Sequence, residues 1–151
     1  MDEKLLQLLI EQAGERRDQA AGAAAEARRQ REAAAATLRT LADYREESLG
    51  RAPARAGTPV GMEQLRAAGQ FDARLVAAIR QQHEVHAQRQ AEASVRDASL
   101  ADRQRRLTAL KTLEERRALA SSRREAKREQ RALDEYATQL AARRRPGKDR
   151  P

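Results

Sequence analysis

Apolar side chains recur at alternating intervals of three and four residues along the first third of the chain. Nine of the thirteen positions on this spacing are apolar, and five of the nine are alanine. The positions are Leu6, Leu9, Ala13, Arg16, Ala20, Ala23, Ala27, Gln30, Ala34, Thr37, Leu41, Tyr44 and Ser48. Such spacing places side chains on one face of an α-helix, as in a coiled-coil seam. We expect close but weak helix packing where the seam is alanine.

The stretch "GRAPARAGTPVG", residues 50–61, interrupts this pattern. Gly50 suits the left-handed residue that follows many helices, and Pro53 cannot continue a helix. Thr58 and Pro59 suit the N-cap and first turn of a second helix. With Asp2 as the first N-cap, we predict a helix over about 3–49 and a loop over 50–61.

A second helix is predicted over about 62–145, since no proline occurs before Pro146 and Gly69 is the only glycine. Its apolar stripe comprises Leu65, Ala68, Leu75, Ile79, Leu100, Leu107 and Leu110. The stripe thins between Gln82 and Arg96. It then changes phase through Leu113 and Leu119 toward Leu133, Tyr136 and Leu140, which indicates local unwinding rather than a break.

These patterns predict an all-α fold, a long antiparallel two-helix coiled-coil hairpin with unequal helices. At 1.5 Å per residue the helices are ~70 and ~125 Å long, so the N-terminus lies near the level of residue 107. The rest of the second helix is expected as a C-terminal overhang, followed by a disordered basic tail over 146–151. The whole chain, 1–151, is expected to form a single coiled-coil domain.

The composition agrees with long helices, since 36% of the 151 residues are charged, 2% are aromatic and mean hydropathy is −0.91. Cysteine is absent, which excludes disulfides and thiolate metal sites. The apolar runs are shorter than the ~20 residues of a membrane span. The N-terminus is unlike a signal peptide. A soluble intracellular protein is expected.

The net positive charge of the chain comes entirely from its last third. Residues 1–100 hold 15 basic and 15 acidic side chains, and residues 101–151 hold 16 and 8. The run "RRALASSRREAKREQRALDEY", residues 116–136, is the most basic part. Such a segment suits an acidic protein surface, anionic lipid or nucleic acid, or serves only to solvate a helix.

Candidate chemistry is sparse. His83 and His86 lie three residues apart with Glu84 between them, but no further ligand cluster is present, so neither a metal nor a cofactor is expected. The carboxylates alternate with arginine at helical spacings and indicate a solvated face. "GRAPARAG" lacks the features of a phosphate-binding loop. We therefore expect no enzyme.

Two of the three aromatic residues, Tyr44 and Phe71, flank the interruption. In a hairpin both lie near its tip, with Leu41, Leu75 and Ile79. They either close the tip or form an exposed cluster that binds a partner.

Four segments in this order resemble the flagellar FliJ family of the bacterial type III export apparatus: "LRTLADYREE", "QFDARLVAAIRQQ", "RQRRLTALKTLEERR" and "EAKREQRALDEYA". The resemblance implies a non-enzymatic coiled coil similar to the central stalk of rotary ATPases. Its implied partners are the export ATPase ring, the membrane export gate protein and export substrate chaperones, at the cytoplasmic face of the membrane at the flagellar base. Nucleic acid is not an expected partner.

The resemblance also implies site residues. The gate-binding positions are Leu41, Tyr44, Phe71, Leu75 and Ala78. For the ATPase ring we expect the basic end together with the N-terminal leucines: Leu6, Leu9, Arg116, Arg117, Arg123, Arg124, Lys127 and Arg128. Two alternatives from the residues alone stay open, a basic coiled coil that binds nucleic acid and a purely structural rod or homodimer.

Overall fold

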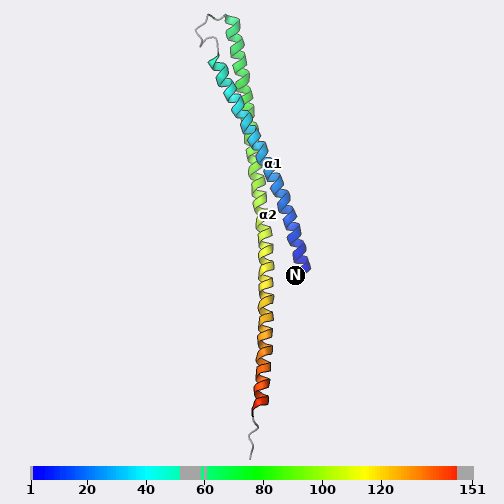
Figure 1. Ribbon diagram of the computed structural model, residues 1–151. Coiled ribbons are helices and arrows are strands. Elements are labelled where there is room, and N and C mark those ends of the chain that lie inside the picture. The colour runs from blue at the N-terminus through cyan, green and yellow to red at the C-terminus, as the bar shows by residue number, and fades with distance from the viewer. Residues whose placement is uncertain (1, 52–58, 60, 146–151) are drawn as a thin grey trace, which may run out of the picture. The chain divides into compact units, whose positions relative to one another are not determined.

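The computed structural model of the chain describes residues 2–51, 59 and 61–145, which contain two α-helices and no strand (Figure 1). Helix α1 spans Glu3–Gly50 and helix α2 spans Met62–Arg144. Their lengths are 48 and 83 residues. The predicted all-α class, with two packed helices of unequal length, is confirmed.

Backbone hydrogen bonds define where the helices begin. The Leu6 N–H donates to the Asp2 carbonyl at 3.0 Å, so Asp2 occupies the N-cap position of α1. The Leu65 N–H donates to the Gly61 carbonyl at 3.2 Å, which places the N-cap of α2 at Gly61. Pro59 therefore lies before the helix, and its prediction as the first helical residue is wrong. Thr58 lies outside the described residues.

Helix α1 ends one residue later than expected. Gly50 is its last residue, and the Arg51 N–H still donates to the Glu47 carbonyl at 3.1 Å. The φ angle of Gly50 is outside the left-handed range, so the predicted left-handed cap at this position is wrong. The helical pattern of backbone hydrogen bonds therefore continues to Arg51. Pro53 and the tail 146–151 lie outside the described residues.

The chain divides into two compact units. One is Gln12–Arg105, and the other combines Met1–Glu11 with Arg106–Pro151. In the first unit, α1 and α2 run antiparallel, because polar contacts pair rising residue numbers on α1 with falling numbers on α2. These pairs are Arg28 with Asp97, Gln30 with Arg89, Ala34 with Gln82, and Arg45 with Asp72.

The core of the described residues is small and rich in alanine. It consists of eight buried apolar side chains, five of which are alanine. They are Leu6, Ala13, Ala24, Ala27, Ala34, Leu75, Ala93 and Leu107. Alanine buries little area, so each contributes far less than the ~1.5–3 kcal/mol of a buried leucine.

The seam of α1 matches the expected one at every seventh position from Leu6 to Ser48. Between these positions it often lies one residue later than predicted. Arg16, Thr37 and Tyr44 are exposed. The residues that follow them, Arg17, Leu38 and Arg45, are half-buried, and Ala24 rather than Ala23 is completely buried. The intervals between seam positions therefore run four then three residues. An α-helix has 3.6 residues per turn, so either order keeps the seam on one face, and here the later of the two adjacent side chains faces the partner helix.

The seam of α2 does not stop between Gln82 and Arg96. It continues through half-buried polar residues, Gln82, His86 and Arg89, to the completely buried Ala93. Gln82 donates its side-chain amide to the Ala34 carbonyl at 3.1 Å. Leu65, which the apolar stripe included, is 44% exposed and lies outside the seam.

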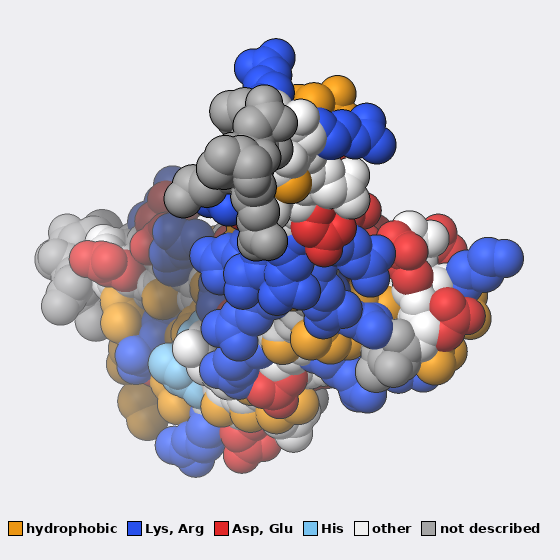
Figure 2. Space-filling view, turned by 90° about the horizontal axis from the view of Figure 1, so that it is seen from below, with side chains coloured by type: hydrophobic (Ala, Val, Ile, Leu, Met, Phe, Trp, Pro, Cys, Tyr) orange, Lys and Arg blue, Asp and Glu red, His pale blue; other side chains and the backbone are white. Residues whose placement is uncertain are grey.

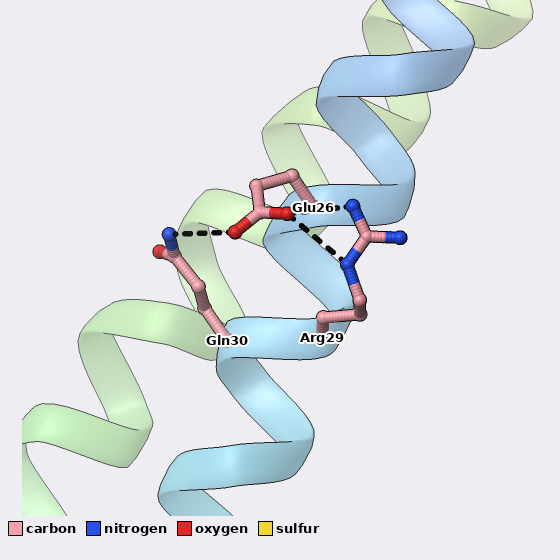
Figure 3. Close-up of polar contacts among 3 residues, drawn as sticks. All are labelled: Glu26, Arg29 and Gln30. Atoms are coloured by element: carbon pink, nitrogen blue, oxygen red, sulfur yellow. Dashed lines mark hydrogen bonds and ion pairs between the residues drawn. The ribbon is translucent and has the colours of Figure 1, made fainter.

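A chain of polar contacts joins the helices around Gln30. On α1, Glu26 accepts from Arg29 at 2.6 Å and from Gln30 at 3.3 Å (Figure 3). The side-chain amide oxygen of Gln30, Oε1, in turn accepts from Arg89 of α2 at 2.7 Å. The hydrogen bonds from Arg29, and then from Gln30, lower the pKa of Glu26. Polar contacts therefore supply much of the interhelical bonding where the seam is alanine.

Replacing Ala24 with leucine should destabilise the fold, because Ala24 is completely buried and the adjacent polar contacts fix the helix separation. Overpacking of this kind costs ~1–3 kcal/mol. Thermal unfolding followed by circular dichroism measures it. Ala36→Leu is the matched control, since Ala36 is exposed on the same helix. Equal stability of the two variants would contradict the tight alanine packing.

Candidate functional site

Tyr44 of α1 and Phe71 of α2 contact each other in the Gln12–Arg105 unit. Their ring centroids lie 6.0 Å apart at an interplanar angle of 79°, an edge-to-face arrangement. Tyr44 nevertheless remains 54% exposed and Phe71 40% exposed. The pair therefore joins the two helices and also presents aromatic surface to solvent.

Further exposed apolar side chains surround this pair. We call the set of Tyr44, Leu49, Met62, Leu65 and Phe71 the tip patch. Met62 is 71% exposed, Leu65 44% and Leu49 37%. Four of the five, all but Met62, line a hollow of about 550 Å³. An exposed apolar cluster around a hollow is typical of a protein-binding surface.

An ion pair lies directly beside the aromatic pair. Arg45 follows Tyr44, Asp72 follows Phe71, and the guanidinium donates to both carboxylate oxygens, at 2.8 Å and 3.2 Å. This bidentate geometry is the strong form of the arginine–carboxylate interaction. Hydrogen bonding from Arg45 lowers the pKa of Asp72, and the same bond raises the pKa of Arg45. Neighbouring contacts on α1 and α2 thus hold the tip patch in place.

The five residues expected at the gate-binding surface differ in accessibility. Tyr44 and Phe71 are exposed, Leu41 and Ala78 are half-buried, and Leu75 is only 8% exposed. Leu75 is therefore a core residue and offers a partner little surface. Leu49, Met62 and Leu65 were not expected there. The sequence signal that could have identified them is their position next to the Gly/Pro-rich interruption.

The residues expected at the ATPase-binding surface lie in the other unit. Their basic members on α2 are all exposed: Arg116, Arg117, Arg123, Arg124, Lys127 and Arg128. Viewed toward the C-terminal end of α2, Lys and Arg side chains gather at the centre of the surface (Figure 2). Leu6 is only 2% exposed and Leu9 is half-buried. Leu6 is therefore a core residue and offers a partner little surface.

The two histidines lie on α2 and differ in exposure. His83 is exposed and His86 half-buried. In the part of the chain that the structure describes, no three His, Asp or Glu side chains are grouped to hold a metal ion. The histidines and carboxylates along the helices are therefore best explained as seam or surface residues.

Two long packed helices of unequal length define an all-α coiled-coil protein. A model of the flagellar FliJ protein family matches residues 3–146, nearly the whole chain. The chain belongs to this family, and it is accordingly a non-enzymatic component of the flagellar export apparatus.

The other comparisons add no relative. No curated protein and no solved structure matched the chain. Within the described residues, neither helix contains a stretch long and apolar enough to cross a membrane.

The Arg45–Asp72 pair should make the tip patch sensitive to acid. Because the pKa of Asp72 is lowered on folding, its stabilisation is present above the pKa of unfolded aspartate, ~3.9. It is lost as the pH falls through the lower folded value. The protection of amides near Asp72 against hydrogen exchange, corrected for the intrinsic exchange rate at each pH, should therefore fall on acidification. In Asp72→Asn this protection should be lower at neutral pH and change less with pH, and identical pH profiles would contradict this role.

Proposed function

We propose that the chain is a stalk-like coiled coil of the flagellar export apparatus that connects two partners. The tip patch docks on the membrane export gate protein, and the basic segment Arg116–Arg131 docks on the export ATPase ring. Through these partners the protein works at the cytoplasmic face of the membrane at the flagellar base, where it also escorts export substrate chaperones.

The observation that carries the gate proposal is the exposed Tyr44–Phe71 pair. Aromatic residues that are held rigidly and partly exposed are the commonest energetic centres of protein interfaces. Tyr44 and Phe71 are held by each other and by the bidentate Arg45–Asp72 pair beside them. Little side-chain freedom would therefore be lost on binding, which favours affinity.

The ATPase proposal depends on charge. The basic segment contains seven Lys or Arg and two Glu residues. Exposed charges of one sign attract a surface of the opposite sign and accelerate its encounter. An acidic lining in the ATPase ring would suit this segment, and an elongated basic helix could reach several subunits of it.

Replacing Tyr44 and Phe71 together with alanine should weaken binding to the purified cytoplasmic domain of the gate protein. If the pair is the energetic centre, a loss of about 2–4 kcal/mol is expected, which is a rise in Kd of about 30-fold or more. Calorimetry measures the Kd and circular dichroism verifies that helicity is kept.

Because Tyr44 and Phe71 also contact each other, a second variant tests the surface itself. Met62→Ala with Leu65→Ala removes exposed tip-patch side chains that lie outside the ring contact. Tyr136→Ala is the control, a tyrosine of the other unit that is 62% exposed, against 54% for Tyr44. Full gate affinity in both tip variants would refute the docking role.

Charge reversal at Arg123 and Arg124 should reduce retention of the chain by the assembled ATPase ring at moderate salt. The expected loss is severalfold or more, because repulsion replaces attraction. Arg74→Glu with Arg80→Glu is the control, with the same change in charge at exposed positions of the other unit. Equal retention of the two double variants would place the ATPase contact elsewhere. Tight, salt-sensitive binding to heparin without ring retention would favour nucleic acid.

A further inference from the structure

The last part of α2 carries a second apolar stripe. Leu119, Ala126, Leu133 and Leu140 recur every seven residues, and Tyr136 lies beside them. We call these five residues the distal stripe. Leu119 is 53% exposed, Leu133 64% and Tyr136 62%. Large apolar side chains are thus left in solvent on a helix that is otherwise densely charged.

The distal stripe does not continue the buried face of the same helix. Leu107 is only 5% exposed, and Leu119 follows it by twelve residues. At 3.6 residues per turn, this interval turns Leu119 roughly 120° away from Leu107, and Leu133 roughly 80° away. The change of phase seen in the sequence therefore produces a separate apolar surface. Residues 121–139 are all exposed, so the described part of the chain leaves this surface open.

The spacing identifies the shape of what fits the distal stripe. One apolar position in every seven residues forms a narrow line along a helix, which is half of the two-position seam of a coiled coil, and another α-helix fits along such a line. Ala126 between Leu119 and Leu133 allows a second helix to approach closely. From Leu119 to Leu140 the stripe covers about 33 Å of helix at 1.5 Å per residue, enough for a partner helix of similar length.

The surrounding charges identify the chemistry of that helix. Arg116, Arg123 and Lys127 flank one edge of the stripe, at roughly 60–100° from Ala126 around the helix, and the two glutamates, Glu125 and Glu129, flank the other edge. The basic segment has seven basic and two acidic residues, so the net charges of two copies repel each other. An acidic helix is attracted by this net charge and can pair with the basic edge. Nucleic acid would satisfy the arginines but would leave the leucines without a partner.

We propose that the distal stripe binds an amphipathic α-helix of a partner protein, with an apolar seam along the leucines and acidic side chains facing Arg116, Arg123 and Lys127. The inference names the kind of element that the basic end accepts, and to that extent it rests on the proposed function.

The test uses the full chain and a synthetic helical peptide of about six turns. The peptide carries leucine at heptad core positions and glutamate at the flanking positions, and a control peptide carries lysine at the flanks instead. Fluorescence anisotropy should show binding of the glutamate peptide, at least tenfold weaker binding of the lysine peptide, and loss of affinity as salt is raised. Leu119→Ala with Leu133→Ala should weaken binding of the glutamate peptide at least tenfold. Val95→Ala, an exposed apolar residue of the other unit, should leave its affinity unchanged.

Several outcomes would overturn the inference. Equal affinity for the two peptides, or equal affinity of the stripe variant and Val95→Ala for the glutamate peptide, would show that the distal stripe does not bind an acidic helix. Preference for duplex DNA over the peptide would favour nucleic acid. Self-association abolished by the stripe variant would favour a second copy.

The same measurements separate this inference from the proposed function. Peptide binding without retention by the ATPase ring would reject the ATPase contact and keep the helix-binding stripe. Ring retention with no peptide binding would reject the stripe and keep the ATPase contact.

Discussion

The constraint on which this structure depends is how little apolar area two helices can bury against each other. Among the described residues of the larger unit, Gln12–Arg105, one buried side chain is a leucine, Leu75, and the other buried apolar side chains are alanine. Each alanine adds little free energy of burial, but each lets the helix axes approach. Close approach brings long polar side chains of one helix within reach of the other. The Gln82 amide reaches the Ala34 carbonyl in this way, and Arg89 reaches Gln30.

The same constraint explains why the larger aromatic and aliphatic side chains lie on the surface. Tyr44 and Phe71 lie outside the buried alanine positions, and their rings meet edge to face and remain partly in solvent. In a globular protein with a thick core, such residues would be interior. Here exposure is the consequence of the fold, and a family that assembles with other export components has use for accessible apolar surface.

The sequence predicted the fold class and the presence of both Tyr44 and Phe71 near the end of the hairpin, because hydrophobic spacing and one Gly/Pro-rich interruption determine both. It did not resolve which of two adjacent residues faces the partner helix. Arg16 and Arg17 are identical, as are Ala23 and Ala24, so periodicity cannot distinguish them. The polar seam at Gln82 and Arg89 was not predicted, because a search for hydrophobic spacing does not register hydrogen-bonding side chains. The Arg45–Asp72 pair was not predicted either, because the residues that pair across two helices are known only once the register of the helices is known.

The polar contacts between the helices specify the register of α1 against α2. Alanines repeated every seven residues pack almost equally well after a shift of two turns, so an alanine seam alone leaves the alignment of α1 and α2 weakly specified. A shift would separate Arg28 from Asp97 and Arg45 from Asp72, and it would leave the half-buried Gln30 and Arg89 without each other. Unpaired polar groups in a helix interface are costly even where the pairs themselves add modest stability. Tyr44 and Phe71 also meet in only one alignment, so the contacts that specify the register also assemble the tip patch.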